Sequence, residues 1–190
     1  MAAMLEVKLD PAQLEKLANL IGAAGKNAPA ALASAINHTG DKAKTAMTQA
    51  LTVQTGLQKK VIVKALRVTR AGAGSLTYTI RSAGGDVSLK YFGARETRAG
   101  VSAAPWGRRQ VYTGTFIKGG RFPNRVALPK LNGQVMRRES GSKLPIAKAK
   151  SGLFIPNEMV TGATAVAFNE VAERDLPDRL AHELLRVIGG

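Results

Sequence analysis

Apolar side chains recur every three or four residues near the start of the chain, which is the spacing of an amphipathic helix. Asp10 followed by Pro11 is typical of a helix start, with an acidic cap before a proline in the first turn. Leu14, Leu17 and Ile21 then share one face, and we expect this helix to end over 22–25, where glycines recur.

A second helix is predicted over 29–52, with Asn27 as its cap. Gly40 weakens the middle of this helix and allows a break over 38–41. After a Thr-Gly pair, a short third helix is expected over 57–66. The first third of the chain is therefore predicted to be helical.

Apolar and polar residues alternate over 76–81 and again over 87–91, which is the pattern of half-buried strands. The intervening Gly-Gly-Asp over 84–86 suits a hairpin turn, so we expect the two strands to pair with each other. Residues 93–107 read as a loop, and 110–118 as a further strand with a bulge at Gly114. Residues 121–150 mix short extended pieces with polar loop.

The helical pattern resumes near Asn157. Pro177 is expected to divide it, with Asp175 as the cap of the last helix. Helices at both ends and strands between them predict an α+β fold, with one central antiparallel sheet and long loops. We expect one domain over 1–190, with a helical part over 1–66, a basic β-rich core over 67–155 and a helical part over 156–190.

Composition narrows the class of protein. The 190 residues include no cysteine, which removes disulfides, thiolate metal sites and cysteine nucleophiles. No apolar run reaches about 18 residues, so neither a transmembrane helix nor a membrane partner is expected. Aromatic residues make up only 5%, so the core must consist mainly of aliphatic side chains.

The net charge of +15 is unevenly placed. Residues 81–150 hold fifteen basic and three acidic residues, whereas 151–190 hold three basic and six acidic ones. Three interpretations remain open: a solvated basic surface, a face held near phosphates, or a basic segment on which the acidic end of a neighbouring copy docks. No base-reading motif accompanies the charge, so sequence-specific recognition is not expected.

No motif indicates catalysis. His38 and His182 lie in separate predicted helices, and no pair of residues has metal-ligand spacing. Glu170 and Glu173 are three apart on a helix and are interpreted as solvated residues or partners of Arg174. We therefore expect neither an enzyme, nor a metal, nor a cofactor, and a hydrolase with an unrecognised site would need clustered acids or histidines in a pocket.

The stretch 88–117 interleaves aromatic and cationic residues. Trp106 is close in sequence to Arg108 and Arg109, so guanidinium stacking on its indole is one interpretation. The other is that aromatic and glycine residues anchor a long loop to the core. The structural anchors expected are Phe92, Gly93, Trp106, Gly107 and Phe116.

These residues carry a resemblance. The runs LKYFGARETRAGVS (89–102), WGRR (106–109) and YTGTFI (112–117) resemble the core of the bacteriophage minor tail protein Z family. The runs ASAINHTG (33–40), TGLQKKV (55–61) and KLPI (143–146) fit the same family, so the resemblance covers most of 28–160. These are tail completion proteins of long-tailed phages, and they are not enzymes.

The resemblance implies a structural virion protein that completes the head-proximal end of a tail, assembled in the host cytoplasm. It implies a ring of copies, sixfold by analogy with the tail, that supports head–tail joining around viral DNA. The implied partners are the tail terminator, the tail tube or tape-measure protein, and the head-closure or connector proteins. The rival hypothesis, motivated by charge alone, is a free nucleic-acid-binding protein without sequence preference.

We expect seven cations to face either DNA or a neighbouring subunit. They are Lys90, Arg95, Arg98, Arg108, Arg109, Lys118 and Arg121.

Overall fold

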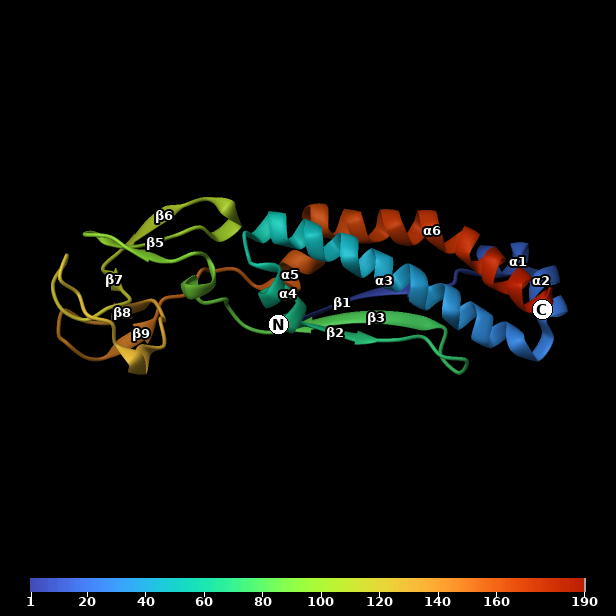
Figure 1. Ribbon diagram of the computed structural model, residues 1–190, viewed down its shortest axis with the longest axis horizontal. Helices are drawn as coiled ribbons and strands as arrows, with labels where there is room; N and C mark the ends of the chain where they lie inside the picture. Colours follow the sequence, from blue (N-terminus) through green and yellow to red (C-terminus); the bar gives the residue numbers. More distant parts are fainter. Residues whose placement is uncertain (190) are drawn as a thin grey trace.

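Two long helices, α3 (Ala28–Thr55) and α6 (Gly162–Ile188), pack side by side in the computed structural model, which describes residues 1–189 (Figure 1). At 1.5 Å per residue each is about 40 Å long, which makes the molecule elongated. Their buried sides include small residues such as Ala31, Ala35 and Ala43, which let neighbouring elements approach closely.

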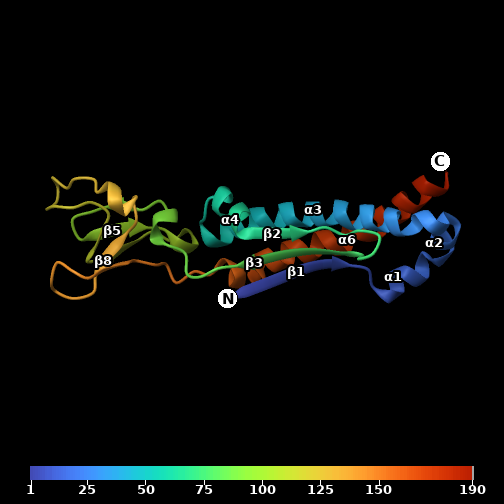
Figure 2. The same ribbon diagram turned by 90° about the horizontal axis from the view of Figure 1, so that it is seen from below.

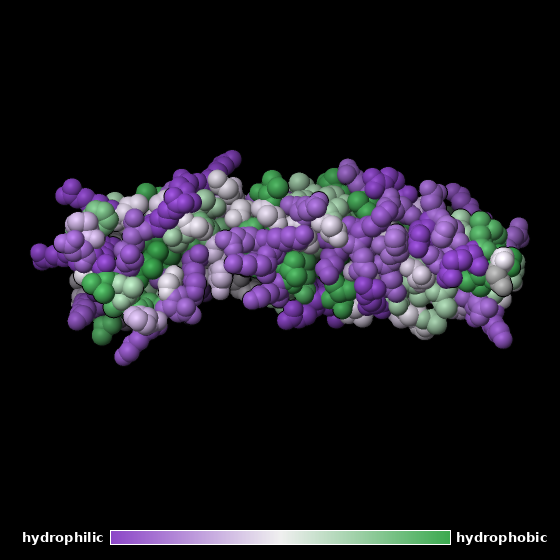
Figure 3. All heavy atoms as spheres, viewed as in Figure 1, coloured by the Kyte–Doolittle hydropathy of each residue, from purple (hydrophilic) through white to green (hydrophobic). Residues whose placement is uncertain are grey.

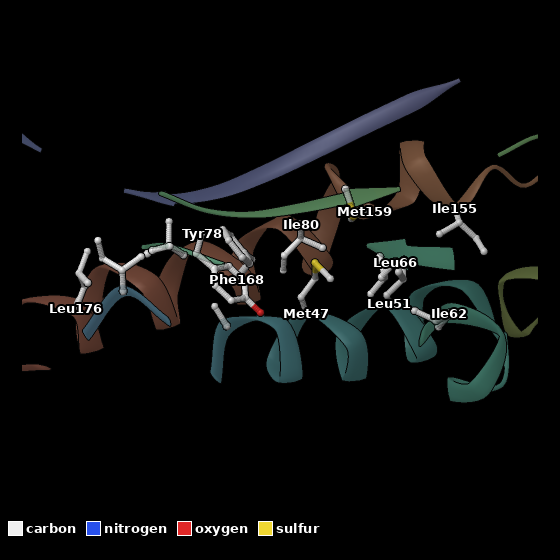
Figure 4. Close-up of a cluster of buried hydrophobic side chains, with 14 of the residues drawn as sticks. Met47, Leu51, Ile62, Leu66, Tyr78, Ile80, Ile155, Met159, Phe168 and Leu176 are labelled. Carbon is white, nitrogen blue, oxygen red and sulfur yellow. The ribbon is translucent and has the colours of Figure 1, made fainter. Parts of the chain in front are cut away.

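A three-stranded antiparallel sheet lies against one side of this helix pair (Figures 1 and 2). Its order is β1 (Ala2–Lys8), β3 (Thr77–Ala83) and β2 (Leu66–Thr69), with Ala2 opposite Ala83 and Leu66 opposite Ser82. The core between sheet and helices is almost wholly aliphatic, with a few large side chains at its centre (Figure 4). Those without exposed surface include Met47, Leu51, Tyr78 and Ile80.

Strand β1 corrects the prediction that 1–66 holds only helices. Its side chains alternate in burial, with Ala3, Leu5 and Val7 turned toward the core. This period of two is the pattern of a strand with one buried face. The pairing of β1 with β3 joins residues 69 to 81 positions apart, so local pattern alone does not reveal it.

Helix α3 is continuous through Gly40, so the predicted break over 38–41 does not occur. A Cβ atom at Gly40 would lie only 2.4 Å from Cγ of Tyr78, whose ring packs over this point of the helix. The Tyr78 hydroxyl donates a hydrogen bond to Oδ1 of Asp41 (2.9 Å), one residue further along. Burial and this hydrogen bond raise the pKa of Tyr78 well above its ordinary value.

Four short helices complete this half of the molecule: α1 (Pro11–Lys16), α2 (Ala18–Ala24), α4 (Lys59–Ala65) and α5 (Ile155–Met159). The predicted start at Asp10 is confirmed, because its carboxylate accepts a hydrogen bond from the Gln13 backbone N–H at 2.8 Å. In return, the Gln13 side chain accepts one from the Asp10 backbone N–H. A 3₁₀ turn, η1 (Gly25–Asn27), leads from α2 into α3.

Pro177 does not divide the last helix, since α6 runs through it. The proline lies on the exposed side, where the carbonyl group left without a donor can be hydrated. Asp175 is therefore not a helix cap. Its carboxylate pairs instead with Lys42 of α3 (2.8 Å) and with Arg174 (2.7 Å).

The other end of the molecule is formed by residues 84–154, which we call the β lobe (Figure 1). One antiparallel sheet has the order β4 (Arg95–Glu96), β5 (Gly100–Ala103), β6 (Gln110–Thr113). The second has the order β7 (Thr115–Phe116), β8 (Met136–Arg138), β9 (Ile146–Lys148). Three 3₁₀ turns connect them: η2 (Leu89–Tyr91), η3 (Pro105–Gly107) and η4 (Pro129–Leu131).

Three predictions for this lobe are wrong. No hairpin forms over 84–86, because β3 pairs with β1 and β2, whereas the Val87 N–H donates to the Leu153 carbonyl (2.9 Å). The expected loop over 93–107 contains β4 and β5. The expected strand over 110–118 divides at Gly114, whose φ of +71° redirects the chain from one sheet to the other.

The fold class is confirmed as α+β: helices at both ends of the chain and antiparallel strands in the middle. The sheet predicted as one unit is three small sheets, of which two belong to the β lobe.

Candidate nucleic-acid interface

The β lobe carries most of the positive charge, and its cations are largely without acidic partners. Among the fifteen basic residues of 81–150, only Arg125 forms an ion pair within residues 1–189. Hydrophilic side chains project outward over this end of the molecule (Figure 3). Unpaired, exposed guanidinium and ammonium groups are what a polyanion contacts first.

The one ion pair of the β lobe fixes its internal structure. Glu96 Oε1 accepts hydrogen bonds from Arg125 Nη1 (2.8 Å) and from the backbone N–H groups of Ile117 (2.8 Å) and Lys118 (3.2 Å). Burial acts to raise the pKa of Glu96, but these three donors outweigh it and lower the pKa below its ordinary value. Glu96 thus ties β4 to the chain that follows β7.

Two of the seven predicted cations are engaged within the protein. Arg109 folds back on its own sheet, with Nη1 3.1 Å from Ser102 Oγ and 3.3 Å from the Gly93 carbonyl oxygen. Lys90 is half-buried and its ammonium donates to the Asn132 carbonyl. Both side chains therefore hold loops in place, which local sequence does not show because their partners are seven to 42 residues away.

The other five predicted cations are exposed, and their side chains make no hydrogen bond to any described residue. They are Arg95, Arg98, Arg108, Lys118 and Arg121. Arg98 and Lys118 line one hollow of about 560 Å³, together with Arg138 and Lys143, which the sequence did not single out. Arg125 lines the hollow as well, so the structure brings five cations to one place, of which all but Arg125 are without an ion pair within 1–189.

Phe116 borders this hollow, and the Arg138 guanidinium carbon lies 5.4 Å from the centre of its ring. This is the cation–π contact of the β lobe, whereas stacking of Arg108 or Arg109 on Trp106, one of the two interpretations of the sequence, does not occur among the described residues. Such a contact contributes about 0.5–1 kcal/mol at an exposed site.

The predicted anchors differ in what they do. Phe92 is buried, with 2% of its surface exposed, and Gly93 and Gly107 adopt positive φ angles. Trp106 is 41% exposed, so it is not a buried anchor. Its backbone is left-handed, and its indole Nε1 donates a hydrogen bond to Oε1 of Glu158.

A second basic hollow, also of about 560 Å³, lies where α4 meets the β lobe. Lys60 and Lys64 of α4 face it from one side and Lys148 and Lys150 from the other. These four lysines are not among the cations predicted from the sequence. Their spacing in the sequence could have indicated two basic faces. Lys60 and Lys64 are four apart, which places them on one face of a helix, and Lys148 and Lys150 are two apart, which places them on one face of an extended chain.

The two histidines lie in separate helices, as predicted, yet both line the same groove. His38 and His182 line one groove between α3 and α6, together with Lys42, Asp175 and Arg179. Acidic and basic groups alternate there, and Arg179 pairs with the buried Glu183 at 2.6 Å. No group of three metal-ligating side chains occurs among the described residues.

None of the helices over 1–189 combines the length and apolar character needed to cross a bilayer. Comparisons of the chain with protein-family models, with curated proteins and with solved structures found no match.

Proposed function

We propose that this chain is a structural virion protein that completes the head-proximal end of a phage tail, as a ring around the DNA channel. Two observations support the proposal. The central block of the sequence resembles the minor tail protein Z family, and that block supplies three of the five exposed cations that have no partner among the described residues: Arg95, Arg98 and Arg108. The unpaired cations carry the argument, because they leave positive charge available for contact with the genome or another subunit.

The physical mechanism proposed is guidance of the duplex. Lys and Arg side chains attract DNA through its phosphates, without reading bases. Each exposed charge is screened over a Debye length of about 8 Å at physiological ionic strength. A ring of dispersed cations therefore centres the duplex without one deep binding site, so the genome end is held at the head–tail junction and still passes during ejection.

The test is complementation of tails assembled without this chain. We expect the triple variant Arg95→Glu, Arg98→Glu, Arg108→Glu to form tails that join heads poorly and give few infectious particles. The matched control reverses Lys8, Lys16 and Lys26, which are exposed and lie outside the β lobe. Equal infectivity of both variants and the unaltered chain would contradict the proposal.

The rival function, a free nucleic-acid-binding protein, predicts a different outcome. The isolated chain would then bind duplex DNA tightly at about 150 mM salt, with an affinity that falls linearly in logarithmic salt. A tail subunit instead binds weakly as a single copy, because each copy supplies only a few phosphate contacts.

A further inference from the structure

The β lobe and helix α6 differ in which charged groups are left without an ion pair. All three arginines of α6 are in ion pairs: Arg174 with Asp175, and Arg179 and Arg186 with Glu183. The exposed carboxylates of α6 are in none within the described chain. These are Glu170, Glu173 and Asp178. The molecule therefore presents free cations at one end and free carboxylates along its last helix.

The free carboxylates belong to a defined stripe of α6. Val166, Glu170 and Glu173 are spaced by four and three residues, which places them on one face of the helix. Val166 is 53% exposed although it is apolar. We call these three residues the acidic stripe. An acidic helix face that includes an exposed valine is suited to contact with a basic surface that has an apolar floor.

The hollow between α4 and the β lobe has that character. Lys60 and Lys64 are one helical turn apart on α4, and Lys148 and Lys150 are on one side of the extended chain opposite. None of the four is in an ion pair within 1–189. We call this group the lysine hollow.

Part of the lining of the lysine hollow is apolar, and we call this part its floor: Val61, Val87, Tyr91 and Ile155. The acid that also lines it is Asp86, whose Oδ1 accepts the Gly152 backbone N–H at 2.8 Å. Tyr91 is 42% exposed there. The hollow thus combines lysines from two segments of the chain with apolar side chains.

We propose that the acidic stripe of one copy docks in the lysine hollow of a second copy. Val166 would pack on the apolar floor, and Glu170 and Glu173 would each meet lysines of the neighbour. The two surfaces belong to different parts of the molecule, so the contact is head-to-tail and repeats from copy to copy. This proposal rests on the proposed function, because it names the interface through which the copies of the ring would contact one another.

A second copy is favoured over DNA as the occupant of this hollow. The hollow has an apolar floor, whereas a phosphate backbone has no apolar surface to cover it. The unpaired carboxylates of α6 in a second copy also supply the negative charge that the four lysines attract. Pairing the two surfaces lowers the repulsion between copies that each carry a charge of +15.

The test uses complementary charge reversals in the full chain, followed by sedimentation velocity. One variant is Lys60→Glu with Lys64→Glu, and the other is Glu170→Lys with Glu173→Lys. Each variant alone places like charges at the interface, so we expect the self-association constant to weaken by about a hundredfold. Mixed in equal amounts, the variants regain opposite charges wherever one meets the other, and we expect assembly to return.

The mixture distinguishes a broken interface from a failure to fold, because two misfolded chains do not restore each other. A control with Lys16→Glu and Lys26→Glu, two exposed lysines that line neither surface, should assemble as the unaltered chain does. An unaltered chain that stays monomeric at every concentration, or a mixture that does not assemble, would overturn the proposal. The proposal would also be overturned if the Lys60 and Lys64 reversals weakened binding to a short DNA duplex and left self-association unchanged, because nucleic acid would then be the occupant of the hollow.

The outcome is independent of the test of the proposed function. Assembly restored by mixing, together with full infectivity of the Arg95, Arg98 and Arg108 reversals, would retain the interface and reject the role in head joining. Reduced infectivity of those arginine reversals, together with lysine and glutamate variants that do not assemble when mixed, would retain the role in head joining and reject the interface.

Discussion

The indole Nε1 of Trp106 donates a hydrogen bond to Oε1 of Glu158 across 3.0 Å, which joins the β lobe to the helices. The second oxygen of Glu158 accepts from Gln54 Nε2 at 2.7 Å. Gln54 Oε1 in turn accepts the backbone N–H (3.1 Å) and hydroxyl (2.9 Å) of Thr164. One hydrogen-bonded chain therefore connects η3 to the end of α3 and the start of α6.

The Gln54 side chain is expected to contribute more to stability than the indole N–H. Gln54→Ala leaves the buried Thr164 hydroxyl and the N–H of the first turn of α6 without their partner, which costs about 2 kcal/mol of unfolding free energy. Trp106→Phe removes one exposed hydrogen bond and costs about 0.5–1 kcal/mol. Urea unfolding checks both values, and equal losses would contradict this ranking.

Gly40→Ala is expected to destabilise the protein although alanine favours helices. The new methyl group would lie 2.4 Å from the buried Tyr78 ring, and overpacking of this kind costs about 1–3 kcal/mol. The matched control is Gly22→Ala in α2, where no atom lies within 4 Å of the added carbon. There we expect a neutral or slightly stabilising change, up to about 1 kcal/mol. Thermal unfolding of the two variants compares them directly.

Stability is expected to fall in acid, in part through Asp175. Hydrogen bonds from Arg174 and Lys42 lower the pKa of Asp175 to about 2, from an ordinary 3.8. A depressed folded-state pKa stabilises the protein above the unfolded pKa, and this contribution disappears as the pH falls from about 4 toward 2. Asp175→Asn should therefore reduce the difference in unfolding free energy between pH 5 and pH 2.5, measured by denaturant titration. An unchanged difference would show that Asp175 contributes nothing to the acid sensitivity.

The neighbouring residues Arg108 and Arg109 are expected to respond differently to alanine. Arg109→Ala removes the hydrogen bonds to Ser102 and Gly93 and should lower stability by about 0.5–1.5 kcal/mol. Arg108→Ala should leave stability unchanged, because its side chain has no partner among the described residues. In assembled rings, Arg108→Ala should instead reduce the slope of log DNA affinity against log salt by about 0.9 for each phosphate that is no longer neutralised. A stability loss at Arg108 equal to that at Arg109 would contradict the assignment.

Local patterns predicted the helices well and strand partners poorly. The Asp10 cap and the helical spacing after it depend on neighbours within four residues, and these predictions are confirmed. The hairpin over 84–86 is wrong, because alternation identifies a strand without identifying its partner. Tyr78 and Ile80 lie in the predicted strand, yet β3 pairs with segments before it in the chain.

The candidate site could be predicted only in part, for the same reason. Charge density along the chain located the β lobe, and five of the seven chosen cations are exposed with side chains that make no hydrogen bond within the described chain. The internal roles of Lys90 and Arg109 depend on contacts made only after folding. The lysine hollow combines α4 with the chain after β9, two segments about 85 residues apart, so no local window contains it.

The β lobe leaves the helical half of the molecule and returns to it at the same place. The outgoing and returning segments run side by side, joined by Val87 N–H to the Leu153 carbonyl and by Ser151 N–H to the Val87 carbonyl, each 2.9 Å. In topological terms the lobe is an insertion between β3 and α5. Its length and surface can therefore be changed, or the whole lobe exchanged for another, without altering the path of the helices. The part of the protein that carries the charge can diversify separately from the part that carries the fold.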